Sequence, residues 1–246
     1  MKIIYEPRGA ALEYSQLALN IYEGCEHGCL YCYAPACTFK KREDFYENQA
    51  HRKDVLKKLS CDLTEMKEKK DKRRVLLCFI CDPYQKDNDF NYLTRKCLEL
   101  FWEYGISFQI LTKGGMKAAR DFDLYKPGDA YAATLTFANE IKSKEWEPYA
   151  ASPSDRISSI IKAKEQGIET WVSFEPVIEP GETFKLIDMT YEYTDLYKIG
   201  KINRYNTGIE VDWGEFTYCV VNYLEKLGKK YYIKDSLKPY LSKMRC

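Results

Sequence analysis

Apolar residues along the chain form short continuous runs that alternate with longer stretches of helical periodicity. Residues 75–80 are one such run, and an uninterrupted apolar run is typical of a strand buried on both faces of a parallel sheet. In residues 93–104 the apolar side chains recur every three or four positions, which predicts an amphipathic helix that Gly105 ends. Because strands and helices alternate, the pattern predicts βα units and a parallel sheet.

The same alternation continues along the whole chain. The predicted strands are residues 17–22, 75–80, 106–111, 129–137, 170–174, 196–199 and 231–233. The predicted helical segments are residues 55–66, 93–104, 115–121, 153–166, 183–189 and 216–227, with Ser152 as N-cap of the fourth. Six βα units and an extra C-terminal strand therefore define the expected α/β fold.

No internal repeat, low-complexity stretch or Gly/Ser/Pro linker divides the sequence. A chain of 246 residues with 45% apolar content can bury a sizeable core, and barrel-type α/β folds of this length form one domain. We therefore expect a single domain over 1–246. It would have a short leader (1–14), a core (about 15–205) and a C-terminal extension (about 206–246).

Charge and cysteine content limit the partners and the cellular compartment that we expect for the protein. The formal net charge is +1, so no global field favours DNA, RNA or an anionic membrane. The sequence has no apolar run of 18 residues and no apolar leader, so we expect neither a membrane span nor a signal peptide. Ten cysteines in a chain this rich in core residues do not require a disulfide framework, and a reducing cytoplasm is the expected compartment.

Three cysteines directly after the first predicted strand carry the strongest chemical signal. Cys25, Cys29 and Cys32 are separated by three residues and then by two, on a loop that contains Gly24 and Gly28. The loop follows the C-terminal end of its strand, where βα barrels place their chemistry. A [4Fe–4S] cluster usually has four cysteine ligands, so three thiolates would leave one iron open to another molecule. Open coordination is typical of catalytic metal sites.

A zinc site is the main alternative for these cysteines, together with three buried free thiols. Zinc requires a fourth Cys or His at closed spacing, and His27 could serve only if it folded back between the cysteines. In that case the chain would be a non-enzymatic protein. Zinc or a structural cluster would stabilise a barrel that binds nucleic acid or a partner.

The cysteine spacing, with aromatic Tyr31 just before the last cysteine, resembles the radical S-adenosylmethionine (SAM) superfamily. The resemblance implies an open, partial (β/α)6 barrel in which the three cysteines bind a [4Fe–4S] cluster. The fourth iron then chelates the amino and carboxylate groups of SAM. One electron, from an external flavodoxin- or ferredoxin-like donor, cleaves SAM to methionine and a 5′-deoxyadenosyl radical. This radical abstracts hydrogen from the substrate.

A narrower resemblance is to the radical SAM proteins related to spore photoproduct lyase (SplB-like). It covers roughly residues 20–179 and a short stretch near 234–237. The matching segments are Gly24 to Ala34, Asp82 to Gln85, Leu93 to Arg95, Cys97 to Glu99, Ile110 to Lys113, Arg120-Asp121 and Ser173 to Ile178. It implies a lyase-like reaction on a nucleic-acid base lesion, as in DNA repair.

Several residues near predicted strand ends are candidates for SAM binding. Asp82 follows the second strand, where a carboxylate would accept a charge-assisted hydrogen bond from the SAM ammonium group. Lys113 follows the third strand and resembles the family lysine that meets the SAM carboxylate. Tyr31 and Tyr33 flank a cluster ligand and are candidates for the adenine pocket, although ordinary packing would also explain them.

Further candidates come from the later strands. Thr134 on the fourth strand, with Thr136, is placed to reach the ribose hydroxyls of SAM. Arg156 lies near a helix start and is a second candidate for the SAM carboxylate. Glu175 lies at the end of the fifth strand. For each of these residues a solvated position on the barrel rim is the alternative.

Cys81 is the candidate catalytic residue, because spore photoproduct lyase uses a cysteine near this strand end as a hydrogen-atom donor. Cys78 and Cys81 form a second C-x-x-C pattern. Residues three apart on a strand point to opposite faces, so we expect no second cluster there.

The near-neutral charge and the absence of a recognisable DNA-binding module favour a second hypothesis, a peptide- or protein-modifying radical SAM enzyme. Such enzymes often have a cysteine-rich C-terminal extension, whereas only Cys219 and Cys246 follow residue 200 here. The sequence leaves the substrate, the fate of SAM and the oligomeric state open.

Overall fold

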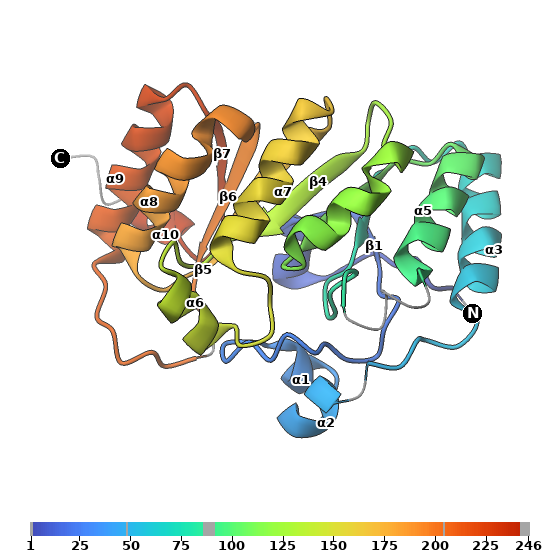
Figure 1. Cartoon of the computed structure of the whole chain (residues 1–246), viewed down its shortest axis with the longest axis horizontal. Helices are drawn as coiled ribbons and strands as arrows, with labels where there is room; N and C mark the ends of the chain where they lie inside the picture. The colour runs from blue at the N-terminus through green and yellow to red at the C-terminus, as the bar shows by residue number, and fades with distance from the viewer. Residues whose placement is uncertain (1, 48, 86–91, 204, 242–246) are drawn as a thin grey trace.

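The computed structural model describes residues 2–47, 49–85, 92–203 and 205–241. Within them seven strands pair in chain order to form one parallel sheet (Figure 1). The strands are β1 (Leu17–Leu19), β2 (Val75–Leu77), β3 (Phe108–Thr112), β4 (Ala130–Thr134), β5 (Glu169–Val177), β6 (Leu196–Lys201) and β7 (Lys230–Ile233). The predicted α/β fold, with βα units and a final strand, is confirmed.

Helices cover the outer face of this sheet (Figure 1). They are α3 (Val55–Glu68), α5 (Leu93–Tyr104), α7 (Pro153–Glu165), α8 (Pro180–Thr190) and α9 (Trp213–Lys226). Shorter helices are α1 (Ala34–Cys37), α2 (Arg42–Glu47), α6 (Glu140–Trp146) and α10 (Lys238–Leu241), and the 3-10 segments are η1 (Gly9–Glu13), η2 (Gly115–Leu124) and η3 (Tyr191–Tyr193). In the described residues we find no helix with the length and apolar character that a membrane span requires.

Two helix boundaries follow directly from local chemistry. The helix α5 ends at Gly105, which adopts φ +68°, a conformation that costs glycine little. The helix α7 begins after Ser152, whose hydroxyl accepts a hydrogen bond of 3.2 Å from the amide of Asp155. Both boundaries agree with the sequence prediction.

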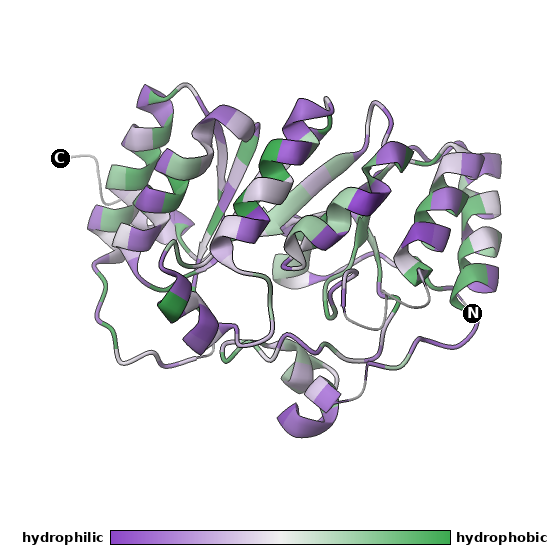
Figure 2. Ribbon diagram, in the orientation of Figure 1, coloured by the Kyte–Doolittle hydropathy of each residue, from purple (hydrophilic) through white to green (hydrophobic). Residues whose placement is uncertain are grey.

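Alternation along each strand divides the buried residues into two layers. Val75 and Leu77 face the helices and join the large outer core, which also holds Leu59 of α3 and Ile160 of α7. Leu76 points to the opposite side, because successive side chains on a strand alternate. Figure 2 shows the matching pattern on the helices, whose hydrophobic positions lie toward the sheet.

The inner layer lies inside the partial barrel and is built largely from small side chains. Ala18, Ala130 and Ala132 leave space for two large rings, Trp171 of β5 and Tyr14 of the leader, whose centroids lie 5.9 Å apart. The leader is further held by Tyr5, which pairs antiparallel with Ala18. The N-terminal segment therefore packs into the amino end of the barrel.

Two strands are shorter than the sequence pattern predicts. The apolar runs 17–22 and 75–80 suggested longer strands, but β1 ends at Leu19 and β2 at Leu77. The side chain of Asn20 explains this difference. Its Oδ1 atom accepts the backbone amides of Phe79 (2.9 Å) and Ile80 (3.0 Å), so this stretch turns toward Asn20 after β2 ends.

A cavity of about 320 Å³ opens at the amino ends of the strands. Tyr14, Trp171 and Lys198 are among the residues that line it. The ammonium of Lys198 donates to the carbonyls of Glu13 and Tyr14, and burial together with the charge of Lys234 lowers its pKa to about 8. The cysteine loop lies at the other, carboxyl end of the sheet.

Candidate active site

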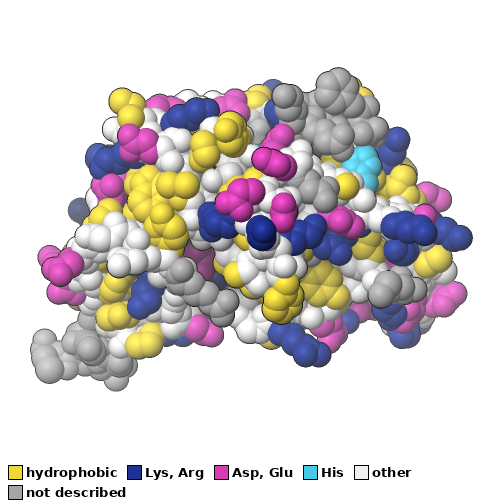
Figure 3. All heavy atoms as spheres, turned by 90° about the horizontal axis from the view of Figure 1, so that it is seen from below, with side chains coloured by type: hydrophobic (Ala, Val, Ile, Leu, Met, Phe, Trp, Pro, Cys, Tyr) yellow, Lys and Arg dark blue, Asp and Glu magenta, His cyan; other side chains and the backbone are white. Residues whose placement is uncertain are grey.

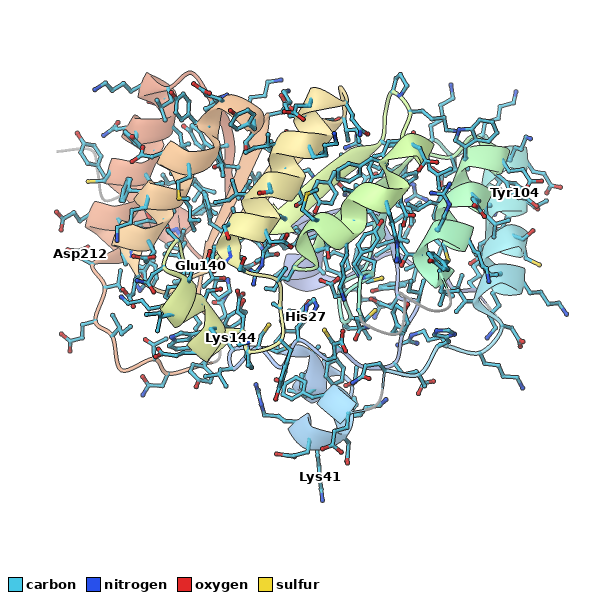
Figure 4. The ribbon with its side chains drawn as sticks, in the orientation of Figure 1. His27, Lys41, Tyr104, Glu140, Lys144 and Asp212 are labelled. Atoms are coloured by element: carbon cyan, nitrogen blue, oxygen red, sulfur yellow. The ribbon has the colours of Figure 1, made fainter. Side chains whose placement is uncertain are left out.

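The cysteine loop leaves β1 at its carboxyl end and reaches α1 through Cys25, Cys29 and Cys32. His27, within this loop, lies between the sheet and the α1–α2 segment (Figure 4). The loop has little regular secondary structure, so its backbone polar groups need partners from elsewhere. Three separate parts of the chain supply them.

The first part is α2, through Arg42. Its guanidinium donates to the carbonyl oxygens of Cys29 (2.9 Å), Leu30 (2.7 Å) and Cys32 (3.2 Å). The hydroxyl of Tyr46 donates to the same Cys29 carbonyl at 2.9 Å. These bonds fix the backbone between the second and third cysteines.

The second part is Gln85, which is fully buried. Its amide nitrogen donates to the carbonyl of Gly24 at 3.2 Å, and its oxygen accepts the backbone amide of Glu26 at 2.8 Å. Gln85 therefore holds the residues on both sides of Cys25 with one planar side chain.

The third part is the segment that follows α6. The amide of Leu30 donates to the carbonyl of Trp146 (2.9 Å), and the amide of Tyr149 donates to that of His27 (3.2 Å). Gly28 adopts φ +65°, and a β-carbon there would lie 3.1 Å from the ring of Tyr149. The close approach and the positive φ both require glycine at this position.

Burial governs the chemistry of the three thiols. It raises the pKa of each, and the pKa of Cys29 reaches about 12 despite the opposing charge of Lys113. The thiols of Cys29, Cys25 and Cys32 are therefore protonated at neutral pH, and iron binding would have to displace the protons. Among the described residues no three His, Cys, Asp or Glu side chains converge as ligands of a single metal ion. A four-iron cluster has its protein ligands on different iron atoms.

Asp82 lies beside the loop, as predicted, but both of its oxygens are used by the fold. One accepts the hydroxyl of Thr112 (2.6 Å) and the amide of Tyr84 (2.8 Å), and the other accepts the amide of Lys113 (2.7 Å). The Nδ1 atom of His27 lies 3.6 Å from this carboxylate. Because burial lowers the pKa of His27, its imidazole is neutral at neutral pH.

Lys113 is a partly buried cation that directly follows β3. Burial lowers its pKa, but interactions with the acidic groups Cys29, Glu147 and Asp82 outweigh that effect and raise it overall, so the ammonium stays charged at neutral pH. Its Nζ atom lies 5.6 Å from the ring centroid of Tyr31. Within the described part of the chain this ammonium makes no ion pair or hydrogen bond, which leaves its donors for an anion.

Arg156, the second candidate for the SAM carboxylate, is already paired. It lies 2.6 Å from the carboxylate of Glu147, and both side chains are buried. Its remaining donors bond the carbonyls of Ala151 (2.7 Å) and Thr134 (3.0 Å). The hydroxyl of Tyr31 also donates to Glu147. The structure thus joins Tyr31, Thr134 and Arg156 in one network.

The other predicted residues take separate positions. Thr136 lies 3.3 Å from Tyr31 and from Glu147, whereas the half-exposed Tyr33 donates to the carbonyl of Phe79 (3.2 Å). Glu175 lies within β5, two residues before its end, and is bonded to Tyr14 and Lys234 on the inner side of the barrel.

Cys81 is buried, and its sulfur lies 4.0 Å from Oδ1 of Asn20. Cys78 and Cys81 belong to the same core cluster, and burial together with the neighbouring Cys81 thiol raises the pKa of Cys78. The expectation that they point to opposite faces is wrong, because β2 ends before Cys78 and the chain turns there. Cys246 lies outside the described residues.

No local pattern in the sequence distinguishes Arg42, Gln85 or Glu147 as site residues. Glu147 follows a polar stretch that is typical of a solvated helix, and Arg42 lies in another. Their roles depend on contacts between residues distant in the chain. Gln85 ends the Asp82-Pro83-Tyr84-Gln85 segment of the family resemblance, which implies no role for it.

Comparison with known proteins identifies the family of this chain. The profile of the Radical SAM superfamily matches residues 19–194, so the chain belongs to this superfamily of enzymes, which use a [4Fe–4S] cluster and SAM. An uncharacterized protein of Methanocaldococcus jannaschii is 29% identical over 181 residues, which cover 72% of this chain and 64% of that protein.

Solved structures show the same fold at low sequence identity. Spore photoproduct lyase complexed with dinucleoside spore photoproduct aligns with a TM-score of 0.70 and 13% identity, over 93% of this chain and 78% of that one. Streptococcus suis SuiB bound to its precursor peptide SuiA aligns with a TM-score of 0.68 and 14% identity, over 95% of this chain and 53% of SuiB. This chain therefore spans about half of SuiB and less than two thirds of the archaeal relative.

Proposed function

We propose that Cys25, Cys29 and Cys32 hold a [4Fe–4S] cluster and that Lys113 binds the carboxylate of SAM. The observation that carries this proposal is the partly buried ammonium of Lys113, which makes no ion pair or hydrogen bond within the described residues and lies beside the cysteine loop. A buried cation is stable when an anion meets it, and a carboxylate would do so with a charge-assisted hydrogen bond. When bound, the cluster and SAM supply a radical that abstracts hydrogen from a substrate.

The chain's own residues arrange this chemistry. Arg42 and Gln85 hold the loop backbone, and Asp82 orients the amide of Lys113. Because Arg156 is neutralised by Glu147, Lys113 is our first candidate for the SAM carboxylate. Tyr31 and Tyr33 remain proposals for the adenine side.

Thr134 remains a proposal for the ribose and Asp82 for the SAM ammonium. Cys81 remains a proposal for the hydrogen-atom donor. Glu175, which is bonded to Tyr14 and Lys234 on the inner side of the barrel, remains a proposal for cofactor binding. The nine described cysteines are free thiols, which supports a reducing compartment such as the cytoplasm.

For the substrate we propose a nucleic-acid base lesion. Exposed aromatic rings border the cysteine loop: Phe39 is 97% exposed, Tyr149 72% and Tyr33 46%. Such rings are typical stacking surfaces for unpaired bases. Figure 3 shows this face, with hydrophobic side chains between charges of both signs, so stacking would contribute more than phosphate binding. The alignment with spore photoproduct lyase, of which this chain covers 78%, also supports a nucleic-acid substrate.

The test is an anaerobic assay of the cluster-loaded protein with dithionite, SAM and either a dinucleoside spore photoproduct or an unstructured peptide. 5′-Deoxyadenosine together with repaired dinucleoside is the expected result. Modification of the peptide alone would favour the peptide-modifying alternative, which the fold of SuiB also supports. A loaded cluster that never cleaves SAM would favour a non-enzymatic iron–sulfur protein.

A further inference from the structure

Glu147 is a buried carboxylate in an unusually dense polar environment. It is 1% exposed, and its oxygens meet the guanidinium of Arg156 and the hydroxyls of Tyr31, Thr136 and Ser143. Burial raises its pKa, but Arg156 and Lys113 outweigh that effect and lower it overall, so the group is an anion at neutral pH.

This anion connects the cysteine loop to the strand ends that face it. Tyr31, between Cys29 and Cys32, donates to Glu147. Arg156, the ion-pair partner of Glu147, donates to the carbonyl of Thr134 at the end of β4. The backbone on each side of Glu147 also bonds the loop, through the carbonyl of Trp146 and the amide of Tyr149. These hydrogen bonds restrict the backbone of the cysteine loop where it faces Glu147.

The charge of Glu147 also acts on the loop. Its carboxylate accepts the hydroxyl of Tyr31, which lies between Cys29 and Cys32 in the sequence, so the negative charge is in direct contact with the cysteine loop. A negative charge beside a buried redox centre disfavours the addition of an electron.

We propose that Glu147 is a positioning residue that orients Tyr31 and lowers the reduction potential of the cluster on Cys25, Cys29 and Cys32. The inference rests on the proposed function. Glu147 acts in two ways: it accepts the hydrogen bond from Tyr31, which orders the loop, and its charge lowers the reduction potential of the cluster.

The test is an EPR-monitored redox titration of the cluster without SAM. Glu147→Gln keeps the shape and an acceptor for Tyr31 but removes the charge, so we expect reduction to become about tenfold more favourable, a rise of 59 mV for one electron. Tyr31→Phe should keep the wild-type potential but speed hydrogen exchange at the Leu30 amide. Glu182→Gln is the matched control, because Glu182 is also buried and paired with a lysine, on α8.

A second variant keeps the test decisive if Glu147→Gln holds its cluster poorly. Glu147→Gln combined with Arg156→Gln restores neutrality, and its potential should lie between those of the wild type and of Glu147→Gln. Potentials equal to that of the wild type in every cluster-loaded variant would overturn the inference. A wild type that binds no four-iron cluster would instead refute the proposed function.

Discussion

The ammonium of Lys113 lies 5.6 Å from the ring centroid of Tyr31, and it finds no carboxylate partner in the described residues. The nearby cation Arg156 does have such a partner, Glu147. The buried Arg156 and the partly buried Lys113 therefore differ in what they can bind. One stabilises the fold, and the other is available to an anionic ligand.

Lys113→Met should weaken SAM binding by about 10- to 100-fold, since a charge-assisted hydrogen bond contributes roughly 1.5–3 kcal/mol. Titration of the cluster-loaded variant with SAM, with binding heat as the readout, measures this loss. Lys229→Met is the control, because Lys229 bonds the carbonyl of Thr194 away from the site. Equal SAM affinity in Lys113→Met and wild type would remove Lys113 from the proposed site.

Gln85→Ala should reduce bound iron, because it leaves the carbonyl of Gly24 and the amide of Glu26 without their partner. Leaving buried polar groups unpaired costs about 1–3 kcal/mol each, so the free energy of unfolding should fall as well. Gln109→Ala is a matched control: Gln109 is also buried and bonds the carbonyl of Tyr14, at the amino end of the barrel. Iron content per chain, measured after reconstitution, should fall in the first variant and not in the second.

Gly28→Ala tests the close approach of the loop to Tyr149. Alanine at positive φ costs about 1 kcal/mol, and a β-carbon at Gly28 would also press on the Tyr149 ring at 3.1 Å. Gly167 has φ +76° with no heavy atom within 4 Å of such a β-carbon, so Gly167→Ala isolates the backbone cost. Denaturant unfolding should show the larger loss for Gly28→Ala. Equal losses would mean that the ring moves aside freely.

Lys198 predicts a pH dependence at the far end of the barrel. Its pKa is about 8 in the folded protein and near 10.5 otherwise, so between these values the unfolded chain binds more protons. Stability should therefore rise as pH increases from 8 toward 10, by on the order of 1–3 kcal/mol. Urea titrations at several pH values would measure the difference between wild type and Lys198→Met. A difference that stays constant over this interval would contradict the assignment.

Much of this architecture follows from local sequence rules. We could predict the cysteine loop after β1, the ends of α5 and α7 and the strand order. These features depend on neighbouring residues or on simple alternation. The turn after Leu77 could not, because the apolar run through Ile80 looks like a strand until Asn20 takes the amides of Phe79 and Ile80.

The hydrogen-bond network around the cysteine loop could not be predicted for a similar reason. Nothing in the local pattern distinguishes Glu147 from the solvated acidic residues of α6, and its role appears only when Tyr31 and Arg156 meet it. Likewise the sequence placed Asp82 near the site but could not show that the amide of Lys113 and the hydroxyl of Thr112 occupy its oxygens. Long-range hydrogen bonds decide these roles.

The measurement that bears most directly on the central claim is the EPR spectrum of the reduced, reconstituted protein with and without SAM. We expect a [4Fe–4S] signal in the wild type that SAM changes, because one iron is open to it, and loss of that signal in Cys29→Ala. Cys97→Ala, a buried thiol in α5, should behave as the wild type does. Zinc in place of iron, or a four-iron signal that SAM leaves unaltered, would contradict the account.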